Sequence, residues 1–177
     1  MNKLVLALCA VFFISTAHTP AKPAAAKINW MTWEQAQAAQ KQHPKKIFVD
    51  VYTEWCGWCK RMDATTFSNT EIISYMNENY YAVKFDAEQK APIQFNGKEY
   101  KFVAQGGRGY HELAAFLMNN KMSYPTTLYL DEKLELLTPL PGYQEPPMLE
   151  TVLNYFATNA YKTTKWEDFD ASFQGKL

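Results

Sequence analysis

Residues 46–60 read KIFVDVYTEWCGWCK, in which an apolar run is followed by two closely spaced cysteines. The part from Ile47 to Tyr52 is a nearly continuous run of β-branched and aromatic residues, which is typical of a central strand buried on both faces. The part that follows places Cys56 and Cys59 where this strand ends and a helix begins. We therefore expect a buried strand that leads directly into a helix carrying two cysteines.

The sequence around this junction predicts an α/β fold. Thr32 to Gln35 fits a capping box for a helix that ends before Pro44, and a helical stripe of apolar residues follows Asn69. Residues 81–86 (YAVKFD) predict a second strand. A strand, a helical region and a strand in this order predict a βαβ unit with a parallel pair.

The second half of the chain predicts further hairpins and helices. Within the less regular residues 87–123, Asn96-Gly97 between short apolar runs indicates a hairpin, and residues 106–109 (GGRG) predict a flexible loop before a helix over residues 110–120. The last four expected elements are two strands at 126–130 and 134–137, a helix over 146–161 and a short helix near Trp166.

The composition excludes several classes of protein. The chain has 177 residues, 47% of them hydrophobic, which suits one globular domain and excludes a disordered chain. With 18 basic and 18 acidic residues the net charge is zero, so we expect no nucleic-acid partner, which would require a basic face. Three cysteines are too few for a small disulfide-stapled scaffold.

The first residues predict an export signal. Residues 1–17 combine an early lysine, an apolar run of 11 residues and small residues at the end, the order of a secretory signal peptide. A buried N-terminal helix is the alternative, whereas a lipoprotein signal does not fit because Cys9 lies inside the apolar run. We expect cleavage at the end of this segment or as late as residue 26, a linker over residues 18–27 and one domain over residues 28–177. The mature protein is then expected to be soluble, and periplasmic or secreted.

The cysteine pair predicts thiol–disulfide chemistry. Cys56 falls at a helix N-terminus, where unpaired N–H groups and the helix dipole favour a thiolate, so it is the expected nucleophile. Cys59, one turn later, can close a disulfide with it and would resolve a mixed disulfide. Two alternatives remain: a structural disulfide, whose loop is too small to stabilise much, and a zinc site, for which the ligands are too few. We expect no metal.

Residues 50–60, DVYTEWCGWCK, resemble the active-site segment of the thioredoxin superfamily. Residues 66–72 and 84–86 are similar to the secreted thioredoxin-like subgroup, which includes the soluble C-terminal domain of the bacterial membrane thiol:disulfide interchange reductase. A third similarity is Tyr124-Pro125-Thr126, whose proline is cis and faces the disulfide in that family. The resemblance implies a thioredoxin fold, with a central mixed sheet of four to five strands flanked by helices, and an insertion over residues 87–123 before the cis-proline.

The resemblance also implies roles for individual residues. Asp50, six residues before Cys56, matches the buried carboxylate of the family and would take the proton of Cys59. The lysine that partners this carboxylate in ordinary thioredoxins aligns near Ala82, so Lys84 is expected to face another way. The residues expected to line the substrate groove are Trp55, Gly57, Trp58, Tyr124, Pro125 and Thr126.

The resulting functional hypothesis is an exported thiol–disulfide oxidoreductase that acts on protein thiols and disulfides without a cofactor. Trp58 replaces the proline usual in reducing thioredoxins, and no histidine lies between the cysteines as in strong oxidants. The motif most resembles the reducing branch, and a reductase in an oxidising compartment needs an electron donor such as a membrane thiol carrier. An oxidase or isomerase of the same fold, and a non-catalytic module that binds exported polypeptides, remain as alternatives.

Overall fold

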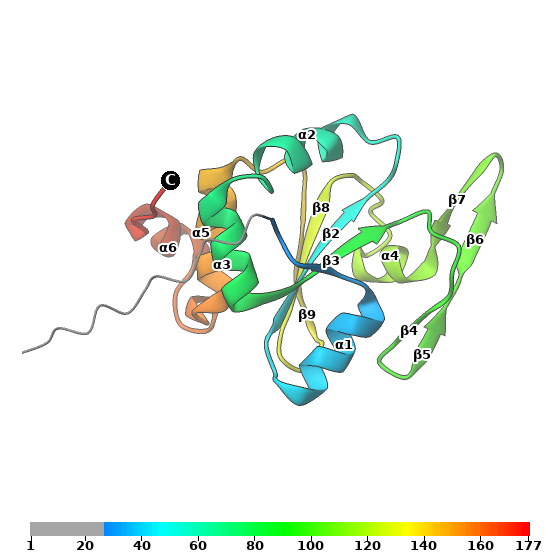
Figure 1. The fold of residues 1–177 in the computed structure, drawn as a ribbon, viewed down its shortest axis with the longest axis horizontal. Coiled ribbons are helices and arrows are strands. Elements are labelled where there is room, and N and C mark those ends of the chain that lie inside the picture. Colours follow the sequence, from blue (N-terminus) through cyan, green and yellow to red (C-terminus); the bar gives the residue numbers. More distant parts are fainter. Residues whose placement is uncertain (1–26) are drawn as a thin grey trace, which may run out of the picture.

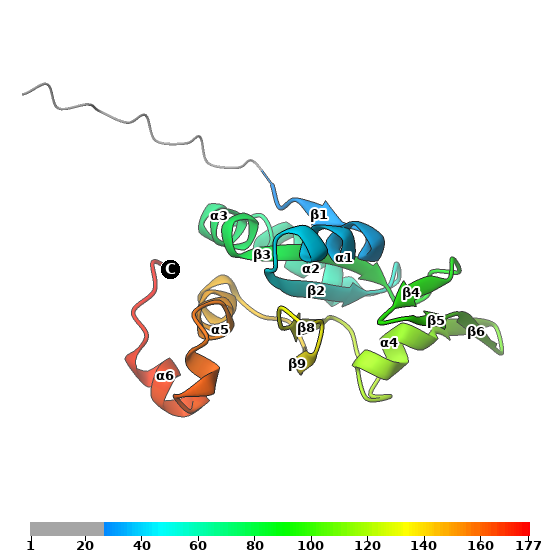
Figure 2. The same ribbon diagram turned by 90° about the horizontal axis from the view of Figure 1, so that it is seen from below.

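The computed structural model describes residues 27–177 and shows a mixed five-stranded sheet between two layers of helices (Figures 1 and 2). The predicted signal peptide therefore lies outside the described residues. The strands of the sheet are β1 (Trp30–Met31), β2 (Lys46–Tyr52), β3 (Tyr80–Asp86), β8 (Thr126–Leu130) and β9 (Leu136–Pro141). The helices are α1 (Trp33–Gln42), α2 (Gly57–Thr65), α3 (Thr70–Asn79), α4 (Glu112–Leu117), α5 (Pro146–Ala157), α6 (Trp166–Ser172) and a 3₁₀ turn at Ala160–Lys162. The predicted thioredoxin-type architecture is confirmed.

Strand β2 lies at the centre of this sheet. The strand order is β1-β3-β2-β8-β9, with β2 parallel to β3 and antiparallel to β8. Because side chains alternate between the two faces of a strand, β2 contributes to both cores. Ile47, Val49 and Val51 pack into the core under α1 and α4, whereas Phe48 packs into the core under α2, α3 and α5. The expectation of a strand buried on both faces is therefore confirmed.

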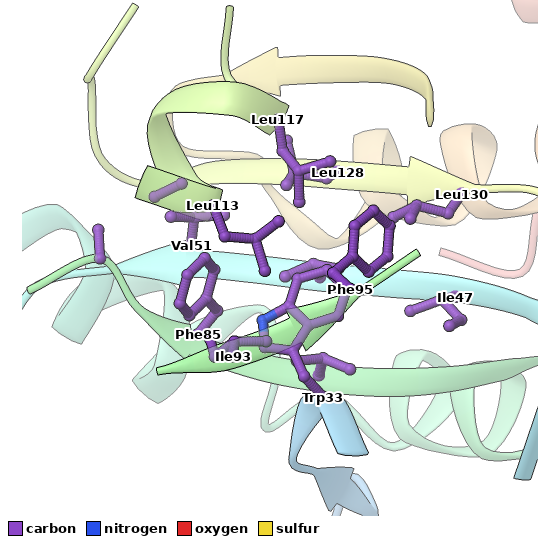
Figure 3. Close-up of a cluster of buried hydrophobic side chains, with 14 of the residues drawn as sticks. Trp33, Ile47, Val51, Phe85, Ile93, Phe95, Leu113, Leu117, Leu128 and Leu130 are labelled. Carbon is purple, nitrogen blue, oxygen red and sulfur yellow. The ribbon is translucent and has the colours of Figure 1, made fainter. Parts of the chain in front are cut away.

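The two helical layers cover opposite faces of the sheet. In Figure 1, α3 and α5 lie on one side of the strands, and α1 and α4 lie on the other. Figure 3 shows the core on the α1 and α4 side, where Trp33 packs against Phe85 and Phe95. The ring centroid of Trp33 lies 5.6 Å from that of Phe85 and 5.2 Å from that of Phe95. Among residues 27–177, no helix has the length and apolar character needed to cross a membrane.

Local sequence signals fix the helix starts. Thr32 and Gln35 form the predicted capping box, with the Gln35 N–H donating to Thr32 Oγ1 and the Thr32 N–H donating to Gln35 Oε1. Asn69 caps α3 by accepting the N–H groups of Glu71 and Ile72. The predicted helix over 146–161 ends earlier, at Ala157, because Asn159 adopts a left-handed conformation (φ 62°) that stops the helical path.

Residues 87–123 form two hairpins followed by α4, at the end of the molecule away from α5 and α6 in both views (Figures 1 and 2). The strands are β4 (Ile93–Phe95) with β5 (Lys98–Tyr100), as predicted around Asn96-Gly97, and β6 (Phe102–Gln105) with β7 (Arg108–His111). The prediction of a flexible loop at 106–109 is wrong, because only Gly106-Gly107 turn and the next two residues pair with β6. The helix predicted over 110–120 is correspondingly shorter.

Gly109 is required where the two strands of the second hairpin approach each other. A Cβ at this position would overlap Cζ of Phe102 and lie 2.5 Å from the carbonyl oxygen of Val103, whereas Gly107 has open space around it. We expect Gly109→Ala to destabilise the β6–β7 hairpin by about 1–3 kcal/mol, the cost of overpacking. Amide hydrogen exchange of Val103 and Tyr110, which pair across the hairpin, measures this directly.

Gly107→Ala is the matched control for this substitution. It adds the same methyl group two residues away in open space, so its exchange rates should equal or fall below those of the wild type. Equal protection in the two variants would contradict the close approach at Gly109.

Candidate active site

The two cysteines lie at the junction between β2 and α2 and are disulfide-bonded to each other. Cys56 is the N-cap of α2, and its Sγ accepts the backbone N–H of Cys59 at 3.0 Å. Its side chain therefore occupies the position where the unpaired N–H groups of a helix favour a negative charge. Both cysteines are nearly buried, with 5% of Cys56 and 2% of Cys59 exposed.

Asp50 lies in the middle of β2 and is 1% exposed. Its Oδ2 accepts the ammonium of Lys84 at 2.5 Å, so the expectation that Lys84 faces another way is wrong. The register explains the contact: Asp50 and Lys84 are partners in the β2–β3 pairing, and partners in adjacent strands project from the same face of the sheet.

Lys84 is shared between two carboxylates and enclosed by aromatic rings. Its ammonium contacts Asp63 of α2 as well as Asp50. Three ring centroids lie 5.0–5.2 Å from the same nitrogen, a distance at which ring faces attract a cation, and these rings belong to Trp30, Tyr52 and Phe67. Burial alone would lower the pKa of Lys84, but the two carboxylates raise it, so the lysine stays charged.

Burial is the largest influence on the pKa of Asp50. It raises the pKa of the carboxyl from its usual 3.8 to about 6, although the nearby Lys84 ammonium lowers it. Oδ1 of this carboxyl has no hydrogen-bond partner among residues 27–177. The group can therefore exchange a proton near neutral pH, and one of its oxygens is available to accept it.

The loop before β8 forms a shallow groove with Trp58, the residue that precedes Cys59. Its Tyr124–Pro125 peptide bond is cis, as the family resemblance implies. The groove has a volume of about 270 Å³, and its lining residues are Trp58, Tyr124, Pro125, Gly142 and Tyr143. The Gly142 N–H donates to the carbonyl of Pro125 at 2.8 Å and so holds the two walls together.

The remaining expected groove residues divide into two groups. Trp55 and Trp58, which flank Cys56, are 52% and 54% exposed, and Gly57 is exposed at the first position of α2. Thr126, by contrast, is buried in β8, and its hydroxyl donates to the carbonyl of Ser123 at 2.8 Å. Its side chain therefore supports the cis-proline loop from inside and does not line the groove.

Several residues at this site were not expected from the sequence. Arg61 lies three residues after Trp58, so helical spacing alone could have placed the two on one face of α2. Pairing the predicted strands in register could have found the contact of Lys84 with Asp50. Tyr143 follows β9 and contacts Trp58, and Arg108 begins β7 and contacts Trp55; both are distant from the motif in the sequence and give no local signal.

Comparisons with known proteins support the fold. The DsbH oxidoreductase structure has a TM-score of 0.57 at 17% identity, covering 81% of this chain and 93% of that one. A thioredoxin-fold protein from Helicobacter pylori has a TM-score of 0.56 at 20% identity, covering 72% of this chain and 79% of that one. At these identities the similarity establishes the shared thioredoxin fold.

A curated relative has a higher sequence identity than these two structures, but over a shorter part of the chain. The uncharacterized protein B0495.5 of Caenorhabditis elegans is 31% identical over 93 residues, which cover 51% of this chain. The match spans about an eighth of that relative's length, 12%. Residues 16–169 match the family Thioredox_DsbH, described as a protein of unknown function (DUF255), and the chain therefore belongs to this thioredoxin-like family.

Proposed function

We propose that this chain is an exported thiol–disulfide oxidoreductase that reduces disulfides in polypeptides. The observation that carries the proposal is the position of Cys56, which caps α2 and whose Sγ accepts the Cys59 N–H beside the cis-proline groove. A sulfur in this position is stabilised as a thiolate, the form that attacks a disulfide. Export rests on the signal-peptide pattern of residues 1–17.

The reaction begins with the reduced pair. The Cys56 thiolate attacks one sulfur of a substrate disulfide, which forms a mixed disulfide and releases the other substrate sulfur as a thiolate. Cys59 then attacks Sγ of Cys56, which releases the second substrate sulfur and forms the Cys56–Cys59 disulfide. Two electrons pass to the substrate, whose two thiolates take up protons. A dithiol donor, such as a membrane thiol carrier, returns the pair to the reduced state.

Asp50 is the proposed proton acceptor for Cys59. The thiol of Cys59 must lose its proton before it can attack, and a carboxylate with a pKa near 6 is ionised and ready to accept it at neutral pH. The free Oδ1 of Asp50 and its place six residues before Cys56 on the strand that leads into the motif support this role.

Cys59→Ser should trap the reaction at its midpoint. The variant can form the mixed disulfide through Cys56 but cannot resolve it, so a polypeptide substrate should remain covalently attached. Non-reducing gel electrophoresis after incubation of the reduced variant with a disulfide-containing protein measures this. The double variant Cys56→Ser/Cys59→Ser is the control and should trap nothing. If Cys59→Ser traps no more than this control, the oxidoreductase assignment is contradicted, and a non-catalytic binding module becomes the alternative to test.

Asp50→Asn should slow the exchange. Loss of the proton acceptor should slow resolution by about 100-fold at pH 7. The wild-type rate should fall as the pH drops through about 6, and the variant should lack this dependence. Stopped-flow measurement of tryptophan fluorescence during oxidation gives both rates.

The pH dependence of the stability of Asp50→Asn tests the raised pKa of the buried Asp50 carboxyl. Because the folded-state pKa of Asp50 is raised, the wild type is relatively stabilised below pH 4 and loses this contribution as the pH rises through 6. The free energy of unfolding of Asp50→Asn, relative to wild type, should therefore rise by about 3 kcal/mol between pH 3 and pH 8. Urea unfolding at each pH measures it, and a flat difference would contradict the raised pKa.

The reduction potential of the Cys56–Cys59 pair tests the direction of the reaction. A reductase should equilibrate with dithiothreitol buffers near −270 mV, the value for thioredoxin. A value near −120 mV, that of a strong oxidant, would reject the reductase assignment and leave the oxidoreductase assignment in place.

A further inference from the structure

The chain contains only two arginines, Arg61 and Arg108, and all its other basic side chains except histidine are lysines. Both arginines lie over tryptophans that flank the active-site cysteines. The guanidinium of Arg61 is 5.1 Å from the ring centroid of Trp58, and that of Arg108 is 4.8 Å from the ring centroid of Trp55. These are distances at which a guanidinium stacks on an aromatic ring and is attracted by it.

Arg61 approaches the groove from helix α2. Its guanidinium lies over the ring of Tyr143 at 5.5 Å as well as over Trp58, and the two rings are 5.5 Å apart. Because both rings line the groove beside Pro125, Arg61 lies at the edge of that groove.

Arg108 approaches from the other side, on the first residue of β7. The base of the β6–β7 hairpin is fixed by His111, which is fully buried and whose N–H donates to the carbonyl of Ala87 at 2.7 Å. Arg108 lies at the far end of this hairpin, beside the Gly106-Gly107 turn, and there contacts the ring of Trp55. Trp55 also contacts Tyr124, and its indole N–H donates to Glu88 at 3.0 Å.

Neither arginine is neutralised within residues 27–177. The ion pairs there all use lysines, and neither guanidinium lies within ion-pair distance of a carboxylate. A guanidinium that lies over a ring still offers its fork of N–H donors, which matches the two oxygens of a carboxylate. The two arginines therefore offer unoccupied carboxylate-binding groups on both sides of the disulfide.

We propose that Arg61 and Arg108 select polypeptide substrates with acidic side chains on both sides of the reacting cysteine. This inference rests on the proposed function and names its substrate class. The two ends are not equivalent, because Glu88 at the Trp55 end opposes an approaching carboxylate, whereas the Trp58 end also carries the exposed Lys60. Arg61 should therefore contribute more to selectivity than Arg108.

The experiment compares two synthetic peptides, each with one internal disulfide. They are identical except that one carries glutamate and the other glutamine on both sides of the first cysteine. The purified full chain is assayed with dithiothreitol as the reductant, and kcat/KM is measured for each peptide. For each enzyme, wild type or variant, the ratio of the two kcat/KM values is compared. A substitution that changes the reduction potential of the cysteine pair affects both values equally and leaves this ratio unchanged.

The wild type should favour the glutamate peptide by about tenfold in kcat/KM, mostly through KM, and 0.5 M salt should reduce this preference. In Arg61→Gln/Arg108→Gln the ratio should fall to about 1, and in Arg61→Lys/Arg108→Lys it should be intermediate, because lysine keeps the charge but not the planar donors. Among the single variants, Arg61→Gln should lower the ratio more.

The control variant Lys41→Gln/Lys133→Gln removes two exposed positive charges at the opposite end of the sheet and should keep the wild-type ratio. A wild-type ratio near 1, or a preference that survives the loss of both arginines, would overturn the selectivity and leave the proposed function intact. Turnover of neither peptide above dithiothreitol alone would overturn the proposed function and this inference together.

Discussion

The pairing of β2 with β3 on one side and β8 on the other is the constraint on which the site depends. The parallel partner β3 sets Lys84 opposite Asp50, and the antiparallel partner β8 sets Thr126 opposite Val51. Since β8 runs against β2, its first residue lies near the last residues of β2, which brings the cis-proline loop to the cysteines. A shift of one residue in either pairing would turn these side chains to the other face of the sheet.

The same constraint explains why a charged pair lies inside an apolar sheet. Asp50 is enclosed because β2 is central, and Lys84 follows it because the register allows no other orientation. Desolvation outweighs the attraction of the lysine, so the carboxyl holds its proton more tightly than an exposed one. Such an arrangement lowers stability at neutral pH, and the use proposed for the carboxylate is to accept the proton of Cys59.

The sequence allowed much of the fold to be predicted, because local signals determine it. The Thr32 capping box, the apolar run of β2 and the Asn96-Gly97 turn all act within a few residues. Two of the errors concern contacts between residues that are not neighbours in the sequence. The orientation of Lys84 depends on strand register, and the hairpin at Gly106–Gly109 depends on Phe102 packing over Gly109 from the opposite strand. Neither relation is visible in a window of neighbouring residues.

The two tryptophans of the cysteine motif are contacted by residues that come later in the chain. Trp55 and Trp58 come with the cysteine motif, yet each remains about half exposed, 52% and 54%, after folding. Exposed indole rings are costly in water unless something covers them, and here Tyr124, Tyr143 and the two guanidinium groups cover part of each ring. Arginine suits this position better than lysine, because its planar group stacks on the ring and still offers donors at its edge. In the proposed function, a substrate segment that reaches Cys56 contacts the exposed parts of these two tryptophans and the donors of the two arginines.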